Sequence, residues 1–334
     1  MHLTVGKIRG LQQISTSRGI FTMTAMDQRG SLQEMVNPTD PDSINYEAMK
    51  RFKLELADVF SPLASAILLD PIYGAAEAIA HGALRGQCGL LVAVEESGYT
   101  SDGSGRLTTF MKGWDVRKIK LMGASAVKLL VYYNPDEPTS AQHQRDVVRQ
   151  VVADCTTWDI PSVVEALAYP LGTMNKNSRE FADIKPDLVI RSARELTPLG
   201  FDLFKAEFPA DYTYEQDEQK LADWCQQLDA ATPMPWVILS AGVDIGTFRK
   251  QVEIACKNGA SGFLAGRAIW KESVVIPDRA ARLRHLRSVS TGYLTSCIEL
   301  AEKYATPWQK KLGQPLAEKA AIHEGWMHTY AQEP

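Results

Sequence analysis

The segment Phe201-Asp202-Leu203-Phe204-Lys205-Ala206-Glu207-Phe208-Pro209 combines an apolar run with a central lysine and a closing proline. Buried strands of α/β proteins have this nearly continuous hydrophobic character. An ammonium group inside such a strand costs several kcal/mol unless it is paired or neutral. A lysine that its surroundings keep neutral can attack a carbonyl group and form a Schiff base. The alternatives for Lys205 are a position at the solvent end of the strand and a structural ion pair.

Seven further short apolar segments alternate with stretches of helical character. The eight predicted strands cover residues 21–26, 65–69, 89–94, 125–131, 161–165, 201–209, 235–239 and 261–265. Eight such units predict an α/β protein with a closed (β/α)8 TIM barrel. A doubly wound open sheet is the alternative, but no glycine-rich fingerprint follows the first strand to favour it.

The rest of the chain is expected to surround this barrel within a single domain. We predict a leading helix in residues 1–20, the barrel in 21–270 and C-terminal helices in 271–334, at about 277–304 and 315–330. Between the strands we predict helices at 43–60, 75–81, 114–122, 140–157, 178–184, 186–196 and 215–230, and a last one between Asp244 and Gly259. The expected N-caps are Asp42 or Ser43, Ser140 and Asp244.

Composition and charge narrow the classes of partner. The chain has 334 residues, 45% hydrophobic and 23% charged, which is typical of globular proteins. Its net charge is −4 with no basic stripe, so we expect no nucleic-acid partner. No signal peptide or membrane-length apolar run is present, and the five cysteines are widely spaced without a CxxC pair. We therefore expect a cytoplasmic protein without a membrane partner, and we expect a homo-oligomer.

Polar residues stand late in, or just after, every predicted strand. The carboxyl ends of barrel strands meet on the face where barrel enzymes do their chemistry. The alternative for any one of these residues is a strand-end side chain that turns into solvent, and for Asp70 and Glu95 both interpretations stay open. The set is Asp27, Asp70, Glu95, Lys128, Glu165, Lys205, Ser240 and Arg267.

Lys128 and Lys205 are predicted to point towards the barrel axis. Two ammonium groups in one pocket repel each other, and burial also disfavours their charge. We therefore expect one lysine to approach the neutral amine that nucleophilic attack requires. Glu165, which lies between them in the chain, is the candidate for proton transfer.

Small residues follow the seventh and eighth strands, where barrels commonly bind phosphate. Ser240-Ala241-Gly242 and Gly266-Arg267 can offer backbone N–H groups and a guanidinium to an anion. The alternative for Arg267 is a surface salt bridge. None of the six histidines lies at a predicted strand end, so we expect neither a metal nor a cofactor.

Longer motifs resemble the class I tagatose 1,6-bisphosphate aldolases over nearly the whole chain. They are AMDQRGSL at 25–32, LLDPIYG at 68–74, EESGY at 95–99, GASAVKLLVYY at 123–133, DLFKAEFP at 202–209, LSAGV at 239–243, AGRAIW at 265–270 and TPW at 306–308. The resemblance implies a metal-independent barrel enzyme. It implies Schiff-base formation by Lys205, proton transfer by Glu165 and a second active-site lysine at Lys128. It also implies that Asp27 and Gln28 meet sugar hydroxyls and that the ketose 1-phosphate is held by Ser240, Gly242, Gly266 and Arg267.

The predicted function is therefore a class I aldolase that reversibly cleaves a phosphorylated ketose. D-tagatose 1,6-bisphosphate is the expected substrate, giving dihydroxyacetone phosphate and glyceraldehyde 3-phosphate. One alternative is 6-deoxy-6-sulfofructose 1-phosphate, because the loops at 97–113 and 170–180 match the family only in part and leave the distal group open. A second alternative is a sugar-phosphate-binding regulator that keeps the barrel without catalysis.

Overall fold

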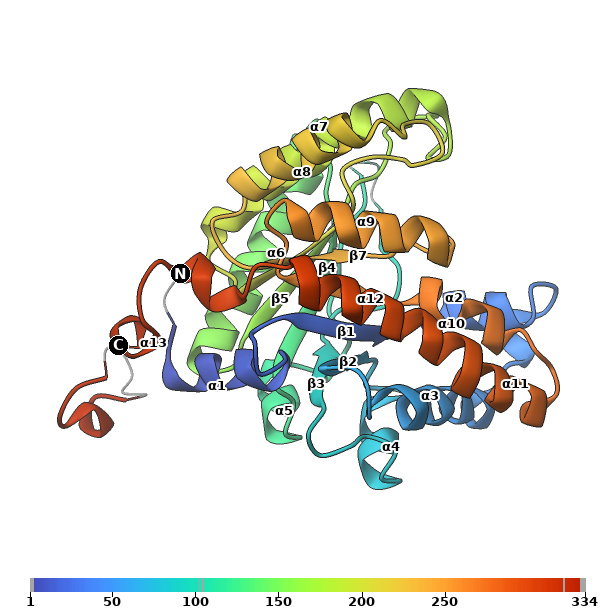
Figure 1. The fold of residues 1–334 in the computed structure, drawn as a ribbon, viewed down its shortest axis with the longest axis horizontal. Helices are drawn as coiled ribbons and strands as arrows, with labels where there is room; N and C mark the ends of the chain where they lie inside the picture. The colour runs from blue at the N-terminus through green and yellow to red at the C-terminus, as the bar shows by residue number, and fades with distance from the viewer. Residues whose placement is uncertain (1–2, 102, 104, 321, 331–334) are drawn as a thin grey trace.

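The strands form a closed parallel barrel in the computed structural model, which describes residues 3–101, 103, 105–320 and 322–330 (Figure 1). Each strand pairs with its neighbour in the chain, and β8 pairs with β1 to close the ring. The strands are β1 Phe21–Met26, β2 Ala66–Leu69, β3 Gly89–Ala93, β4 Ala126–Tyr132, β5 Ser162–Leu167, β6 Leu203–Ala206, β7 Trp236–Leu239 and β8 Gly262–Ala265. The predicted (β/α)8 TIM barrel is confirmed.

Helices surround the barrel and connect successive strands (Figure 1). They are α1 Val5–Gln13, α2 Gly30–Val36, α3 Tyr46–Phe60, α4 Ala75–Ala80, α5 Val116–Leu121, α6 Pro138–Thr157, α7 Arg179–Leu196, α8 Glu218–Ala230, α9 Ile245–Lys257, α10 Arg267–Val274, α11 Arg279–His285, α12 Thr291–Tyr304 and α13 Leu316–Lys319. None of the helices in the described ranges is long and apolar enough to cross a membrane.

Two apolar layers explain why the strands are hydrophobic on both faces. One layer fills the barrel interior and includes Met23, Leu68 and Leu203. The other lies between the strands and the outer helices and includes Leu69 and Phe204. Because side chains alternate along a strand, each strand contributes to both layers.

Helix α1 closes the N-terminal end of the barrel, as expected for the leading segment. Residue Gly10 packs so closely that a Cβ atom there would lie 2.4 Å from the carbonyl oxygen of Ser125, just before β4. Trp308 packs into the same interior layer, and its indole N–H donates to Ser15 Oγ at 3.2 Å. The chain after α12 therefore returns to the floor of the barrel.

Several predicted helix bounds and caps are wrong. The predicted helices at 178–184 and 186–196 form one helix, α7, with Pro186 inside it. Proline usually breaks a helix, but burial of Leu188 and Val189 beyond it supports a continuous helix here. Helix α3 is capped by Asn45, and α6 by Glu137, whose side chain accepts from the Ser140 N–H. The Asp244 cap of α9 is confirmed.

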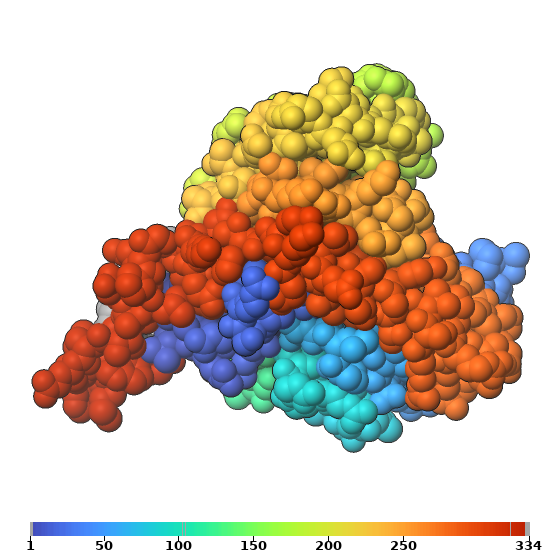
Figure 2. Space-filling view, in the orientation of Figure 1, coloured from blue at the N-terminus to red at the C-terminus, as the bar shows by residue number. Residues whose placement is uncertain are grey.

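The C-terminal region differs most from the sequence prediction. A π-helical turn at Leu286–Ser290 joins α11 to α12, and α12 packs across the outside of β1 and β8 (Figure 1). The C-terminal segment, in orange and red, therefore covers much of the face seen in Figure 2. The predicted helix at 315–330 is reduced to α13 and a 3₁₀ turn at Trp326–His328, among the residues described there. Helix α10 crosses the predicted boundary at residue 270. The division of the chain into 1–20, 21–270 and 271–334 stays a prediction.

A buried ion pair at the barrel floor gives a test of this packing. The Asp202 carboxylate pairs with Lys7 Nζ at 3.0 Å and accepts from the Ser162 N–H at 2.9 Å. Asp202→Ala should lower the free energy of unfolding by about 3–5 kcal/mol, because it leaves a buried ammonium group uncompensated. Urea unfolding measures the loss. Asp146→Ala, which removes an exposed pair with Arg149 on α6, is the control and should lower the free energy of unfolding far less, because exposed pairs contribute little. Equal losses in the two variants would contradict this account.

Candidate active site

Three charged side chains meet inside the barrel on neighbouring strands. Lys128, Glu165 and Lys205 each stand two residues after an inward-facing apolar residue of the same strand. The strand period of two therefore turns all three towards the barrel axis. Within the sheet, Glu165 on β5 is the direct partner of Lys205 on β6. The inward-facing residues that precede the three are Ala126, Val163 and Leu203.

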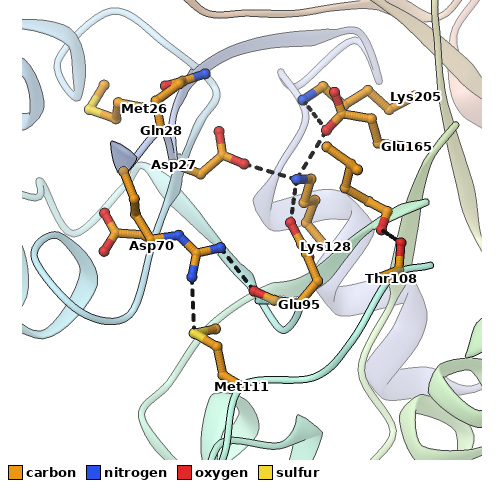
Figure 3. Close-up of polar contacts among 12 residues, drawn as sticks. Met26, Asp27, Gln28, Asp70, Glu95, Thr108, Met111, Lys128, Glu165 and Lys205 are labelled. Atoms are coloured by element: carbon orange, nitrogen blue, oxygen red, sulfur yellow. Dashed lines mark hydrogen bonds and ion pairs between the residues drawn. The ribbon is translucent and has the colours of Figure 1, made fainter. Parts of the chain in front are cut away.

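Glu165 bridges the two lysines. Its Oε2 atom accepts a hydrogen bond from Lys205 Nζ at 2.9 Å and lies 3.1 Å from Lys128 Nζ (Figure 3). All three side chains are nearly buried, with at most 8% of any of them exposed. A proton can therefore pass between Glu165 and either nitrogen without a large movement.

Lys128 lies among three carboxylates. Its Nζ atom is 2.6 Å from Glu95 Oε1 and 2.9 Å from Asp27 Oδ2, in addition to its contact with Glu165 (Figure 3). Burial by itself would lower the pKa of Lys128, but Asp27, Glu165 and Glu95 outweigh burial and hold this pKa well above its usual value. Lys128 is therefore a permanent cation.

This arrangement corrects one expectation from the sequence. Repulsion between the two lysines was predicted to leave one of them neutral, but at Lys128 the neighbouring carboxylates outweigh burial and keep the amine protonated. Burial favours the protonated form of Glu165, and Lys128 and Lys205 overcome that effect and lower its pKa. The same balance, with Lys128 and Lys205 acting against burial, holds the pKa of Asp27 far below its ordinary range. Glu165 is thus an anionic base beside Lys205.

A cavity of about 770 Å³ opens above these residues at the carboxyl ends of the strands. Asp27, Gln28, Lys128, Glu165, Lys205, Gly242 and Arg267 line it. The remaining two predicted site residues, Ser240 and Gly266, lie beside it and are hydrogen-bonded, since the Gly266 N–H donates to Ser240 Oγ at 3.2 Å. The structure therefore brings the predicted site residues together around one cavity.

The ends of β7 and β8 bring together the residues that were predicted to form an anion cradle. Gly242 has φ +84°, a conformation that favours glycine, and a Cβ atom there would lie 3.3 Å from the Arg267 guanidinium carbon. Arg267 begins α10 and has no carboxylate partner among the described residues. The alternative of a surface salt bridge for Arg267 is therefore not seen in this part of the chain.

Two buried oxygen atoms in the cavity wall have no hydrogen-bond partner in the described ranges. They are Gln28 Oε1 and Glu95 Oε2. Buried polar atoms normally have a partner, and an exception requires an explanation. Because Gln28 and Glu95 both line the cavity, its wall has hydrogen-bonding capacity that the protein itself does not use.

Asp70 has a structural contact that sequence reasoning missed. Its carboxylate does not line the cavity but forms a fully buried pair with Lys53 Nζ at 3.0 Å. Lys53 also donates to the carbonyl oxygens of Met26 and Gln28, one on each side of Asp27. Lys53 therefore holds the backbone that carries Asp27. The available signal was the place of Lys53 on the apolar face of its helix, beside Met49, Phe52 and Leu56.

Comparison with known proteins identifies relatives along almost the entire chain. A sequence model of the DeoC/LacD family aldolases matches residues 21–272. Tagatose 1,6-diphosphate aldolase of Listeria monocytogenes is 32% identical over 331 residues, which cover 94% of this chain and 96% of that protein. Tagatose 1,6-diphosphate aldolase 2 of Enterococcus faecalis is 31% identical and covers 93% of this chain and 98% of its own.

Solved structures share the barrel at lower sequence identity. An archaeal fructose 1,6-bisphosphate aldolase matches with a TM-score of 0.53 at 21% identity and covers 86% of this chain and 98% of its own. Fructose-bisphosphate aldolase from Plasmodium falciparum matches with a TM-score of 0.68 at 11% identity, covering 92% of this chain and 98% of that one. At these identities the likeness concerns the fold.

The charge balance around Lys128 generates a prediction about pH. Asp27 and Glu165 have lowered pKa values in the folded protein, so their contribution to stability is present above their ordinary values of 3.8 and 4.5 and is lost as the pH falls below them. Lys128→Met removes the cation that lowers both. At pH 7 the variant should be less stable by about 3–5 kcal/mol, and its deficit should shrink at pH 4, where the carboxylates can take up protons.

Denaturant titrations at the two pH values measure this difference. Lys112→Met, which replaces an exposed lysine between β3 and α5, is the matched control and should show no pH-dependent deficit. A Lys128→Met deficit that is the same at pH 4 and pH 7 would show that the three carboxylates do not depend on Lys128.

Proposed function

We propose that this chain, which belongs to the DeoC/LacD aldolase family and is therefore an aldolase, cleaves a ketose 1-phosphate through a Schiff base on Lys205. The observation that carries the proposal is the hydrogen bond of 2.9 Å between Lys205 Nζ and Glu165 Oε2. A buried amine beside an anionic base, at the bottom of a cavity, is the arrangement that attack on a carbonyl group needs.

Bond cleavage follows from the placement of these groups. Glu165 takes a proton from Lys205, and the free amine attacks C2 of the ketose. Glu165 then gives this proton to the C2 hydroxyl, which leaves as water and gives an iminium ion. Glu165 then removes the proton from the C4 hydroxyl, the C3–C4 bond breaks, and its electron pair moves into the iminium to form an enamine. The aldehyde fragment leaves. Glu165 returns the proton to C3, and water hydrolyses the iminium to release dihydroxyacetone phosphate and regenerate Lys205.

Lys128 and Asp27, which carry opposite charges, support this chemistry in different ways. The ammonium of Lys128 keeps Glu165 ionised, so that Glu165 can act as a base. Of the neighbouring charges, Lys128 lowers the pKa of Glu165 the most. Asp27, Gln28 and Glu95 offer oxygen atoms at the cavity wall to the sugar hydroxyls. In this proposal Lys128 stays charged throughout, and Lys205 alone forms the covalent bond.

The 1-phosphate is proposed to bind at the ends of β7 and β8. Ser240, Gly242 and Gly266 are small residues that leave room for an anion there, and Arg267 supplies a guanidinium without an acidic partner in the described chain. Bidentate binding of a phosphate by arginine is strong and directional. A phosphate fixed at this edge would place C2 of the ketose near Lys205.

D-tagatose 1,6-bisphosphate is the proposed substrate, with dihydroxyacetone phosphate and glyceraldehyde 3-phosphate as products. The names of the relatives in Listeria and Enterococcus support this choice. The presence of Lys128, Glu165 and Lys205 in one contact network argues against a regulator that has lost catalysis. A homo-oligomeric assembly and a cytoplasmic location stay predictions from the sequence.

Reductive trapping tests the covalent step. Borohydride treatment with dihydroxyacetone phosphate should add the reduced triose to Lys205, because borohydride reduces the iminium to a stable amine. Peptide mapping by mass spectrometry locates the adduct. Lys205→Arg should abolish it, while Lys112→Arg serves as the control and should retain it. An adduct on another lysine, or none in the unmodified chain, would contradict the proposed role of Lys205.

The role of Glu165 can be separated from that of Lys205 by a second variant. Glu165→Gln keeps the size of the side chain but removes its basicity, so turnover should fall by about 100- to 10,000-fold. The trapped adduct should still form, although more slowly. A coupled triose-phosphate assay measures turnover, and unchanged turnover would remove Glu165 from the mechanism.

A direct comparison of two substrates tests which anionic group the substrate carries at its distal carbon. Turnover of D-tagatose 1,6-bisphosphate should exceed that of 6-deoxy-6-sulfofructose 1-phosphate in kcat/KM. Both substrates share the 1-phosphate and the C3–C4 bond and differ in the distal anion, so the ratio reports on that group. A higher kcat/KM for the sulfonated sugar would show that D-tagatose 1,6-bisphosphate is not the preferred substrate. It would not contradict the proposed Schiff-base mechanism.

A further inference from the structure

Arg106 lies in the long connection between β3 and α5 and lines the same cavity as the lysines. Three tyrosine rings surround its guanidinium carbon. That carbon lies 4.6 Å from the ring centroid of Tyr99, 4.8 Å from that of Tyr169 and 5.3 Å from that of Tyr132. Cation–π contacts of this kind orient a planar guanidinium without using its N–H groups.

The backbone of Arg106 is held independently of its side chain. Its N–H donates to the Tyr169 hydroxyl at 3.4 Å, and its carbonyl oxygen accepts from Gln144 Nε2 at 2.7 Å. Two residues further on, Thr108 Oγ1 donates to the Leu130 carbonyl oxygen at 3.1 Å. This segment is therefore anchored to β4 and α6 through contacts that do not require a guanidinium group.

The guanidinium group of Arg106 has N–H donors without acceptors in the part of the chain that the structure describes. Two other cations that line the cavity, Lys185 and Arg29, do have partners. Lys185 lies 3.7 Å from the Glu207 carboxylate, and Arg29 donates to the Glu95 carbonyl oxygen at 2.9 Å. Lys176 also lacks a described partner, but it is exposed. Arg106 is half-buried, so its charge is less screened by solvent.

Arg106 and Arg267 stand on opposite sides of the cavity. Arg106 packs on Tyr132 at the end of β4, while Arg267 follows β8, and these two strands are four places apart in a closed ring of eight. Lys205 on β6 lies midway around the ring between them. A ligand held at both arginines would therefore cross the cavity over the lysine.

We propose that Arg106 binds a tetrahedral oxyanion, phosphate or sulfonate, at the distal carbon of the ketose, opposite the 1-phosphate. This inference rests on the proposed function, because it assigns the second end of the same substrate. The neighbouring tyrosines shape the subsite: their rings hold the guanidinium in place and leave its N–H groups free for an anion. Burial raises the pKa of the Tyr132 hydroxyl, so this hydroxyl stays protonated and can donate a hydrogen bond.

Paired substrates test the inference. Arg106→Gln should lower kcat/KM for D-tagatose 1,6-bisphosphate by about 10- to 100-fold, as expected for loss of a charge-assisted hydrogen bond. It should leave kcat/KM for D-tagatose 1-phosphate, which has no distal anion, within about twofold of the unmodified chain. Arg106→Lys should keep part of the activity, and Lys112→Gln is the matched control on the same connection. Equal losses on both sugars, or no loss on either, would overturn the proposal.

A binding measurement keeps the test independent of catalysis and of folding. Calorimetry with hexitol 1,6-bisphosphate and hexitol 1-phosphate, which have no carbonyl group, should show about tenfold or greater preference for the bisphosphate. Arg106→Gln should abolish that preference. Circular dichroism and the Lys205 adduct with dihydroxyacetone phosphate check that the variant is folded. A failed adduct in the unmodified chain would reject the Schiff-base mechanism, whereas an unchanged preference in Arg106→Gln would reject only the role of Arg106.

Comparing a distal phosphate with a distal sulfonate distinguishes the two anions. A phosphate ester gains charge as the pH rises through about 6, but a sulfonate does not titrate there. The contribution of Arg106, measured as the ratio of unmodified to variant affinity, should grow from pH 5.5 to 7.5 with the hexitol bisphosphate and stay constant with a 6-sulfonate analogue. A ratio near one for both ligands at both pH values would overturn the proposal.

Discussion

The ammonium group of Lys128 is the interaction on which the cavity depends. Three carboxylates, those of Asp27, Glu95 and Glu165, contact Lys128 Nζ in a largely buried position inside the barrel. Without a central cation these anions would repel one another and take up protons. Lys128 holds them together in their charged forms, so that Glu165 can face Lys205 as a base. The cation is thus both a structural element of the barrel mouth and an electrostatic control over its neighbours.

Strand register brings this network together. Glu165 and Lys205 are direct partners across β5 and β6, and Lys128 on β4 is the direct partner of Val163, two residues before Glu165. A shift of one residue along a strand would turn its charged side chain into the outer apolar layer, away from its counter-ions in the barrel interior. The hydrophobic residues on both faces of each strand therefore set the register that the polar network requires.

Much of this arrangement follows from local sequence patterns. Short apolar runs and their polar endings predict the strands and the cluster, because alternation and the parallel topology of a barrel leave few other places for Lys128, Glu165 and Lys205. Features that depend on distant contacts could not be predicted in this way. The pair of Lys53 with Asp70 joins α3 to the end of β2, and the continuity of α7 through Pro186 depends on packing. The balance of charge around Lys128 likewise required the positions of all three carboxylates.

The closed floor of the barrel affects the order in which reaction products leave the cavity. Helix α1 and Trp308 close the N-terminal end of the barrel, opposite the cavity. Ligands therefore enter and leave at the C-terminal end of the strands. In the proposed mechanism the fragment bound covalently to Lys205 stays in the cavity after cleavage, and the free aldehyde fragment leaves first through the same opening. With the floor closed, the two products of the proposed reaction leave one after the other through the same opening.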